Sequence, residues 1–211
     1  MKRSDAKLVR EYGPLPGVKN VGGVTYDGEQ VWVATGTALQ ALDPKSGMTL
    51  RSLDVPAHAG TAFDGEHLYQ IAEDRIHKID PNTGRVLASI PAPAAGACSG
   101  LAWHEGSLWV GQYRERKIHQ VDPQTGKVLR TIESQRFVTG VTWIEGDLWH
   151  GTWEDEQSDI RRIDPHTGET LEAIDMPPGL TVSGLESDGA DQFFCGGGSS
   201  GKVRVVRRPK R

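Results

Sequence analysis

Gly140-Val-Thr-Trp-Ile-Glu-Gly-Asp-Leu-Trp149 is the stretch that decides the fold, because its pattern occurs five times in the chain. Each copy begins with a glycine, runs through small or apolar residues, turns at an acidic residue and a glycine, and resumes with apolar and aromatic residues. The other copies begin at Gly23, Gly60, Gly100 and Gly184, the last being degenerate and one residue longer. The copies start 37, 40, 40 and 44 residues apart. A period near forty with short strands and glycine turns is typical of a β-propeller.

A second recurring element, Asp-Pro-x-(Ser/Thr)-Gly, occupies residues 43–47, 80–84, 122–126 and 164–168. The Asp carboxylate can accept backbone hydrogen bonds, Pro presets φ, and Gly tolerates positive φ, so each copy predicts a tight turn. Alternating runs flank it, such as 117–121 before one turn and 127–132 after it. Such alternation indicates half-buried strands. Each repeat therefore predicts four antiparallel strands, and no helix is expected.

The N-terminal segment is predicted to supply the strand that the last repeat lacks. The fifth repeat reaches its third strand at Lys202-Val-Arg-Val-Val206 and has no fourth strand. Ala6-Lys-Leu-Val-Arg-Glu-Tyr12 resembles the fourth strands of the other repeats. We therefore predict an all-β, five-bladed propeller of one domain, residues 1–211, whose ring is closed by the N-terminal strand. Pairing of this strand protects an edge that would otherwise be open.

The composition limits the kinds of partner that we expect this protein to bind. The net charge of −4 argues against general nucleic-acid binding, and no apolar run is long enough to cross a bilayer. The first residues contain no signal-like apolar stretch, so we expect a cytoplasmic protein. Cys98 and Cys195 have neither metal-ligand nor disulfide-framework spacing, so no metal or cofactor is expected. Basic residues gather at both termini, and we interpret them as solvated tails rather than an anion-binding patch. The oligomeric state stays open.

Propeller geometry predicts where a ligand would bind. The two short, repeated turns of each blade lie on one face, and the variable loops lie on the other, where binding sites usually occur. The residue before each repeat glycine lies near the axis on this variable face. These residues are Gly22, Ala59, Ser99, Thr139 and Ser183. They are interpreted either as small residues required where five strands converge or as the mouth of a polar site. Nearby loops add Arg136, Tyr113 and Arg114 as candidate ligand contacts.

Blade four has the longest variable loop, predicted over residues 150–159. Trp153 within it is the one tryptophan without a repeat counterpart, and it stands between Thr152 and the carboxylate of Glu154. A Trp beside carboxylates suits an amine or cation through cation–π contact and ion pairing. The alternative is that Trp153 packs on its own blade. His150 is a candidate general base, or else simply a hydrogen-bonded histidine.

Blades three and four resemble the five-bladed glutaminyl cyclases (glutamine cyclotransferases). The resemblance is carried by Ser99-Gly-Leu-Ala-Trp103, by residues 117–132, and by residues 137–154 with Thr152-Trp153. It implies a five-bladed ring with a site on its axis. It also implies an acidic proton-transfer residue before the glycine of blade four, where this chain has Thr139. Loss of a general acid or base typically lowers a rate about 10²- to 10⁴-fold.

Three functions are compatible with these patterns. We favour a binding protein for a small molecule or peptide terminus, with a pocket on the propeller axis and no efficient cyclase activity. The second is an enzyme, either a divergent glutamine cyclotransferase or a lyase, with His150 and Glu154 as its candidate catalytic groups. The third is a protein-interaction propeller, which would display a large exposed apolar patch.

Overall fold

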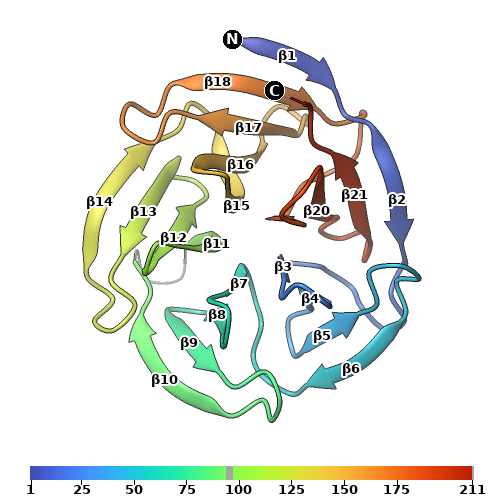
Figure 1. Cartoon of the computed structure of the whole chain (residues 1–211), viewed down its shortest axis with the longest axis vertical. Helices are drawn as coiled ribbons and strands as arrows, with labels where there is room; N and C mark the ends of the chain where they lie inside the picture. The colour runs from blue at the N-terminus through green and yellow to red at the C-terminus, as the bar shows by residue number, and fades with distance from the viewer. Residues whose placement is uncertain (94–96, 211) are drawn as a thin grey trace.

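Five antiparallel sheets stand around one axis in the computed structural model, which describes residues 1–93 and 97–210 (Figure 1). Four sheets have four strands, and the fourth blade has an additional fifth strand. The described residues contain no helix, and so no helical segment among them could cross a membrane. The predicted five-bladed, four-stranded, all-β architecture is confirmed.

The blades follow one another along the chain, each strand 1 lying innermost. The strands of blades one and two are β3 (Gly23–Tyr26), β4 (Val31–Ala34), β5 (Leu39–Leu42), β6 (Thr49–Leu53), β7 (Thr61–Phe63), β8 (Leu68–Ala72), β9 (Arg75–Ile79) and β10 (Val86–Pro91). Those of blades three and four are β11 (Cys98–His104), β12 (Ser107–Gln112), β13 (Lys117–Val121), β14 (Val128–Glu133), β15 (Phe137–Ile144), β16 (Asp147–Trp153), β17 (Asp159–Ile163) and β18 (Thr170–Asp175). The remaining strands are β19 (Gly184–Ser187), β20 (Gln192–Gly196), β21 (Val203–Arg207), β1 (Lys2–Asp5) and β2 (Leu8–Tyr12).

The Asp-Pro turns form as their sequence predicts. In the third, the Asp122 carboxylate accepts hydrogen bonds from the backbone N–H groups of Gln124 and Thr125, at 2.8 and 2.9 Å. Gly126 then takes a φ of +75°, which favours glycine. The N–H donors lower the pKa of Asp122, so the carboxylate stays ionised as the turn requires.

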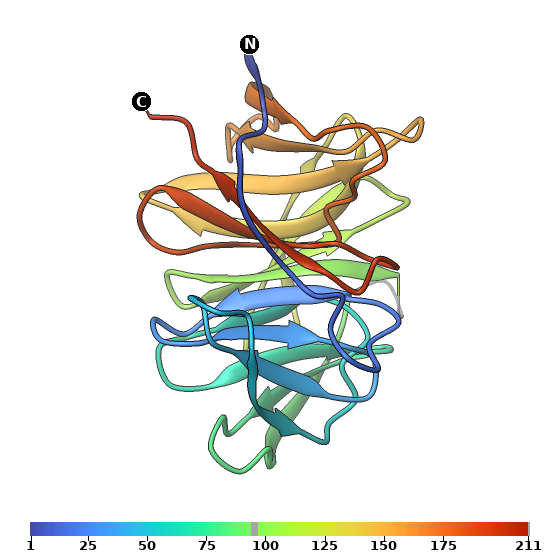
Figure 2. The ribbon, with the colours of Figure 1, turned by 90° about the vertical axis from the view of Figure 1, so that its right-hand side faces the viewer.

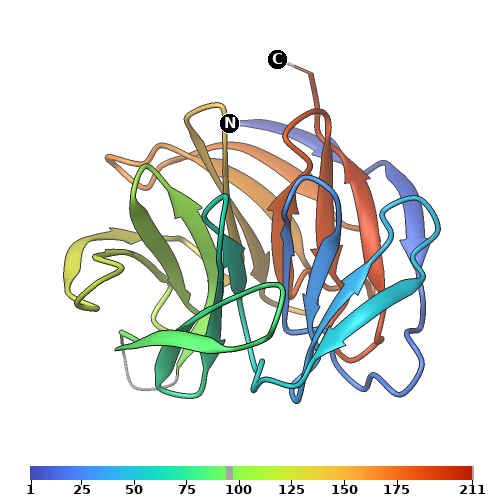
Figure 3. The same ribbon diagram turned by 60° about the horizontal axis from the view of Figure 1, so that its bottom comes forward.

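The N-terminal segment closes the ring, as predicted. Strand β2 pairs antiparallel with β21 and completes blade five, with Tyr12 opposite Val203. The preceding strand β1, which the sequence did not predict, pairs in parallel with β18 on the outside of blade four. The first twelve residues therefore join two blades, and the two chain ends lie on the same side of the molecule (Figure 2, Figure 3).

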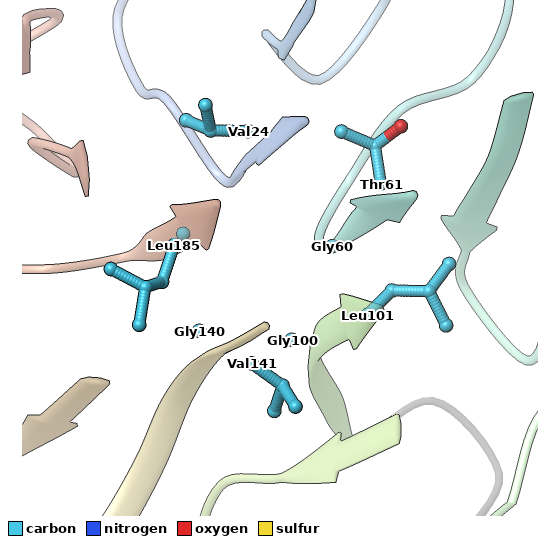
Figure 4. Close-up of a pocket in the computed structure, with 9 residues that line it drawn as sticks. Val24, Gly60, Thr61, Gly100, Leu101, Gly140, Val141 and Leu185 are labelled. Atoms are coloured by element: carbon cyan, nitrogen blue, oxygen red, sulfur yellow. The ribbon is translucent and has the colours of Figure 1, made fainter. Parts of the chain in front are cut away.

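The repeat glycines seal the axis. A Cβ atom on Gly140 would lie 2.5 Å from the backbone N of Leu185, and one on Gly184 would lie 2.8 Å from Cα of Gly23. The following side chains, including Val141 and Leu185, point away from the axis into the spaces between blades (Figure 4). Glycine is required at this level because five backbones converge more closely than any side chain allows.

Aromatic residues at repeat positions fill the spaces between blades. Trp109 and Trp149 are 3% and 2% exposed. The ring of Trp143 lies 4.9 Å from that of Trp109 in the preceding blade, and Trp149 lies 5.1 Å from Phe193 in the following one. The predicted packing role of the repeat tryptophans is confirmed, and the blades form a rigid frame for the loops above them.

Candidate functional site

The small polar residues at the variable-face mouth of the axis mostly connect neighbouring blades. Ser99 Oγ donates to the carbonyl of Val138 at 2.7 Å, and Ser183 Oγ donates to the carbonyl of Val21 at 2.5 Å. Thr139 differs, because its buried Oγ1 has no hydrogen-bond partner among the described residues. Ser99 and Ser183 therefore connect neighbouring blades by hydrogen bonds, while the hydroxyl of Thr139 has no partner among the described residues.

The axis is closed to a ligand beyond its opening on the variable face. The space enclosed by four of the repeat glycines and by adjoining residues of all five blades does not admit a water molecule (Figure 4). A ligand on the axis is therefore restricted to the mouth and the loops around it.

The variable segment of blade four is shorter than the sequence predicts. Residues 150–153 continue β16, because Thr152 and Trp153 pair with Val138 and Phe137 of β15. The loop proper consists of residues 154–158. The prediction that Trp153 lies within a polar loop is thus corrected: it is the last residue of a strand and is partly buried. The backbone hydrogen bonds of an antiparallel pair fix its position more firmly than a loop would.

His150 lies inside the blade. Its side chain is fully buried, Nδ1 donates to the carbonyl of Gly151 at 3.1 Å, and Nε2 lies 3.5 Å from Ser134 Oγ. Burial lowers its pKa to about 4, so the imidazole is neutral at pH 7. The enclosed ring does not meet a ligand approaching from solvent, and this geometry favours the structural interpretation of His150 over a catalytic one.

Glu154 is held between two arginines. Arg116 of blade three donates from Nη2 to Glu154 Oε1, and Nε of Arg136 lies 4.0 Å from Oε2. Arg136 also donates to the carbonyls of Glu154 and Gln157, both at 2.9 Å, and so fixes the turn that carries the carboxylate. Oε2 is beyond hydrogen-bond distance of Arg136 and can still accept from a ligand.

Thr152 belongs to a separate buried network beneath this turn. Its Oγ1 donates to Asp159 Oδ1 at 2.5 Å, and Arg161 binds the same carboxylate through Nε and NH2, each at 2.9 Å. Burial raises the pKa of Asp159, but the hydrogen bonds from Arg161 and Thr152 outweigh burial and lower it. The ionised pair fixes the base of the loop, and Arg136 joins it by donating to Thr152 at 3.1 Å.

Aromatic side chains lie beside the Arg116–Glu154 pair. Phe137 stands opposite Trp153 across the two strands. Its ring lies 5.0 Å from that of Tyr113, and the Arg116 guanidinium lies 4.8 Å above it. Arg114, next to Tyr113, is exposed. We define this group of Tyr113, Arg116, Arg136, Phe137, Trp153 and Glu154 as the blade 3–4 cluster.

The structure thus brings together some predicted residues and separates others. Tyr113, Arg136 and Glu154 lie together in the cluster, Trp153 joins it through its strand pairing with Phe137, and Thr152 accepts a hydrogen bond from Arg136. Sequence reasoning missed Arg116. It precedes Glu154 by 38 residues, nearly one repeat, and this spacing indicates that their loops are neighbours on adjacent blades.

A second missed residue, Glu186, lies near the axis on the opposite side of the glycine ring. The hydroxyls of Thr142 and Thr25 donate to its carboxylate from the two neighbouring blades, at 2.5 and 2.9 Å. Burial raises its pKa to about 7, and no cationic side chain among the described residues forms an ion pair with it. The equivalent positions of the other repeats contain Thr or Ala, so the acidic residue at this position already distinguished blade five in the sequence.

Neither the cysteines nor a metal-binding group adds a candidate site among the described residues. Cys98 and Cys195 are buried free thiols, and burial raises the pKa of each to about 12. Within residues 1–93 and 97–210, no group of three or more His, Cys, Asp or Glu side chains is arranged to hold a metal ion.

The chain is a five-bladed β-propeller with a polar and aromatic cluster on its variable face. The chain is similar to the crystal structure of the glutaminyl cyclase of Myxococcus xanthus, with a TM-score of 0.78 and 18% identity over 98% of this chain and 97% of that one. A chain of the mitotic checkpoint complex gives 0.54 and 16% over 90% and 64% of the two chains. The hydrazine synthase of Kuenenia stuttgartiensis gives 0.53 and 16% over 85% and 56%. No family model and no curated protein sequence matches the chain. At these identities, the likeness concerns the fold.

Proposed function

We propose that this propeller binds a small molecule or a peptide terminus at the blade 3–4 cluster, beside the axial mouth, without efficient cyclase activity. The observation that carries the proposal is the oriented carboxylate of Glu154, fixed by Arg116 and next to the partly buried Trp153. A ligand amine can donate to the free Oε2 of Glu154 and lie against the Trp153 indole, a combination that recognises cations well. Arg114 and Tyr113 border the same position.

Catalysis is disfavoured at the position that the family resemblance indicates. Thr139 presents a hydroxyl where that resemblance implies a carboxylate, and a hydroxyl does not accept a proton at neutral pH as a carboxylate does. His150 is enclosed, and Glu154 is already paired with Arg116. The fold similarity to a glutaminyl cyclase is the observation that keeps a divergent cyclotransferase as the alternative.

A measurement of ammonia release distinguishes a binding protein from a divergent cyclotransferase. Incubation with a peptide that begins with glutamine is expected to give no release above the uncatalysed rate, because Thr139 provides no carboxylate at the axial position and Glu154 is already ion-paired with Arg116. Thr139→Glu is the informative variant, since a gain in rate would locate the reacting group at the axial mouth. A rate comparable with that of a glutaminyl cyclase assayed in parallel would contradict the proposal.

Trp153→Ala tests the cluster itself. The same peptide is expected to bind at least roughly tenfold more weakly to this variant, because the aromatic contact is lost. The partly buried Trp153 should add only about 1–2 kcal/mol to folding. The matched control is Trp109→Ala, which removes a buried indole between blades and should reduce stability considerably more. Equal losses of stability with unchanged binding would make Trp153 a packing residue.

A further inference from the structure

The chain ends form a pocket that the proposed function does not use. It has a volume of about 430 Å³ and lies between the connection of β1 to β2 and the segment that follows β21. Lys7 and Asp5 line one side, and Arg207, Arg208 and Lys210 line the other. The two ends lie near each other in all three ribbon views (Figure 1, Figure 2, Figure 3). Both segments are anchored, because β1 pairs with β18 and β2 pairs with β21.

Positive charge is concentrated in the sequence of the two end segments, and four of these cations line the pocket. Residues 1–10 and 202–211 contain ten of the 24 Lys and Arg residues but only one of the 28 Asp and Glu residues, namely Asp5. The rest of the protein is therefore strongly acidic, so the ends form a positive region on a negative molecule. Such asymmetry attracts anions to one location.

The cations of the pocket divide into fixed and free groups. Arg208 donates to Glu145 at 2.9 Å and to the carbonyl of Ala190 at 2.6 Å, so its guanidinium is held in place. Arg207 lies 3.5 Å from Asp191. No carboxylate among the described residues lies within ion-pair distance of Lys7 or Lys210. These two ammonium groups therefore contribute charge that nothing in the described chain neutralises.

We propose that this pocket binds a phosphate group, either free or carried by a small organic molecule. Arg207 and Arg208 are paired with Asp191 and Glu145, so Lys7 and Lys210 supply the unpaired charge, while the guanidinium groups add N–H donors. This set of cations and donors suits the several acceptor oxygens of a phosphate, which carries about −1.5 to −2 charges at neutral pH. Lys7 and Lys210 lie on different segments of the chain, so their ammonium groups can contact the phosphate oxygens from two sides. The volume exceeds that of the bare ion, and Pro209 supplies an apolar wall for an organic substituent. The pocket is separate from the blade 3–4 cluster and does not depend on the function proposed for it.

Calorimetric titration of the full chain at low ionic strength tests this site, with inorganic phosphate, phenyl phosphate and benzoate as probes. Inorganic phosphate, phenyl phosphate or both should bind saturably and more tightly than benzoate. Tighter binding of phenyl phosphate would identify an organic ester as the preferred source, and equal binding would identify the phosphate alone. Added salt should weaken binding, because the charges are exposed.

Two substitutions and a matched control locate the binding. Lys7→Met and Lys210→Met should each weaken phosphate binding roughly tenfold, while Lys45→Met, an exposed lysine in a turn of blade one, should leave it unchanged. Trp153→Ala should also leave it unchanged, which separates this site from the blade 3–4 cluster. The proposal is overturned if no phosphate binds saturably, if benzoate binds as tightly as phenyl phosphate, or if Lys45→Met has the same effect as Lys7→Met.

Discussion

Deletion of residues 1–12 should abolish cooperative folding or lower the melting temperature severely. The deletion removes β2, so the whole edge of β21 loses its partner, and it removes Tyr12, which is 3% exposed within an apolar core of blades one and five. Loss of a buried aromatic side chain alone costs about 3–5 kcal/mol, a large part of the stability of a typical domain. Circular dichroism during heating measures the result.

Deletion of residues 1–5 is the matched control, because it removes β1 and leaves β2 in place. Strand β1 is charged and largely exposed, and its Arg3 forms an exposed ion pair with Asp175 at 2.6 Å. Exposed ion pairs contribute little, so this shorter deletion should reduce stability by only about 1–2 kcal/mol. If the protein without residues 1–12 melted like the full chain, blade five would not need the N-terminal strand.

The repeat made most of this fold predictable. Five copies with a period near forty set the number of blades, and the missing fourth strand of the last copy indicated how the ring closes. The pairing of β1 with β18 was not predictable, because Lys2–Asp5 has no apolar alternation to mark it as a strand. Its position depends on a β18 edge that exists only after blade four has formed.

The site was predictable only in part, for physical reasons that differ between residues. Loop position indicated Tyr113, Arg136 and Glu154, because variable loops on one face converge. The burial of His150 depends on how far β16 extends beside β15, and that length is set by cross-strand pairing rather than by the local sequence. Arg116 and Glu186 were recognisable only by comparing equivalent positions across blades, because the side chain of each contacts a neighbouring blade.

Glu186 should make the stability of the ring depend on pH. Its carboxyl group lies between blades four and one, with donors but no cation, and burial raises its pKa to about 7 from the ordinary value of 4.5. The folded protein therefore favours the protonated form. The associated stabilisation is complete below about pH 4.5 and is lost as the pH rises through about 7. The difference between the two limits corresponds to about 3 kcal/mol.

Glu186→Gln should remove this dependence and increase the free energy of unfolding at pH 8 by up to about 3 kcal/mol. The amide keeps the shape of the neutral acid: its oxygen can accept from Thr142, and its NH2 can donate to Thr25 if that hydroxyl rotates. Urea unfolding of both proteins at pH 5 and pH 8 measures the effect, with Glu29→Gln, an exposed carboxylate in a turn of blade one, as the control. A variant that is no more stable than the parent protein at pH 8 would show that the donors Thr142, Thr25 and the backbone N–H of Ser187 stabilise the ionised carboxylate more than burial disfavours it.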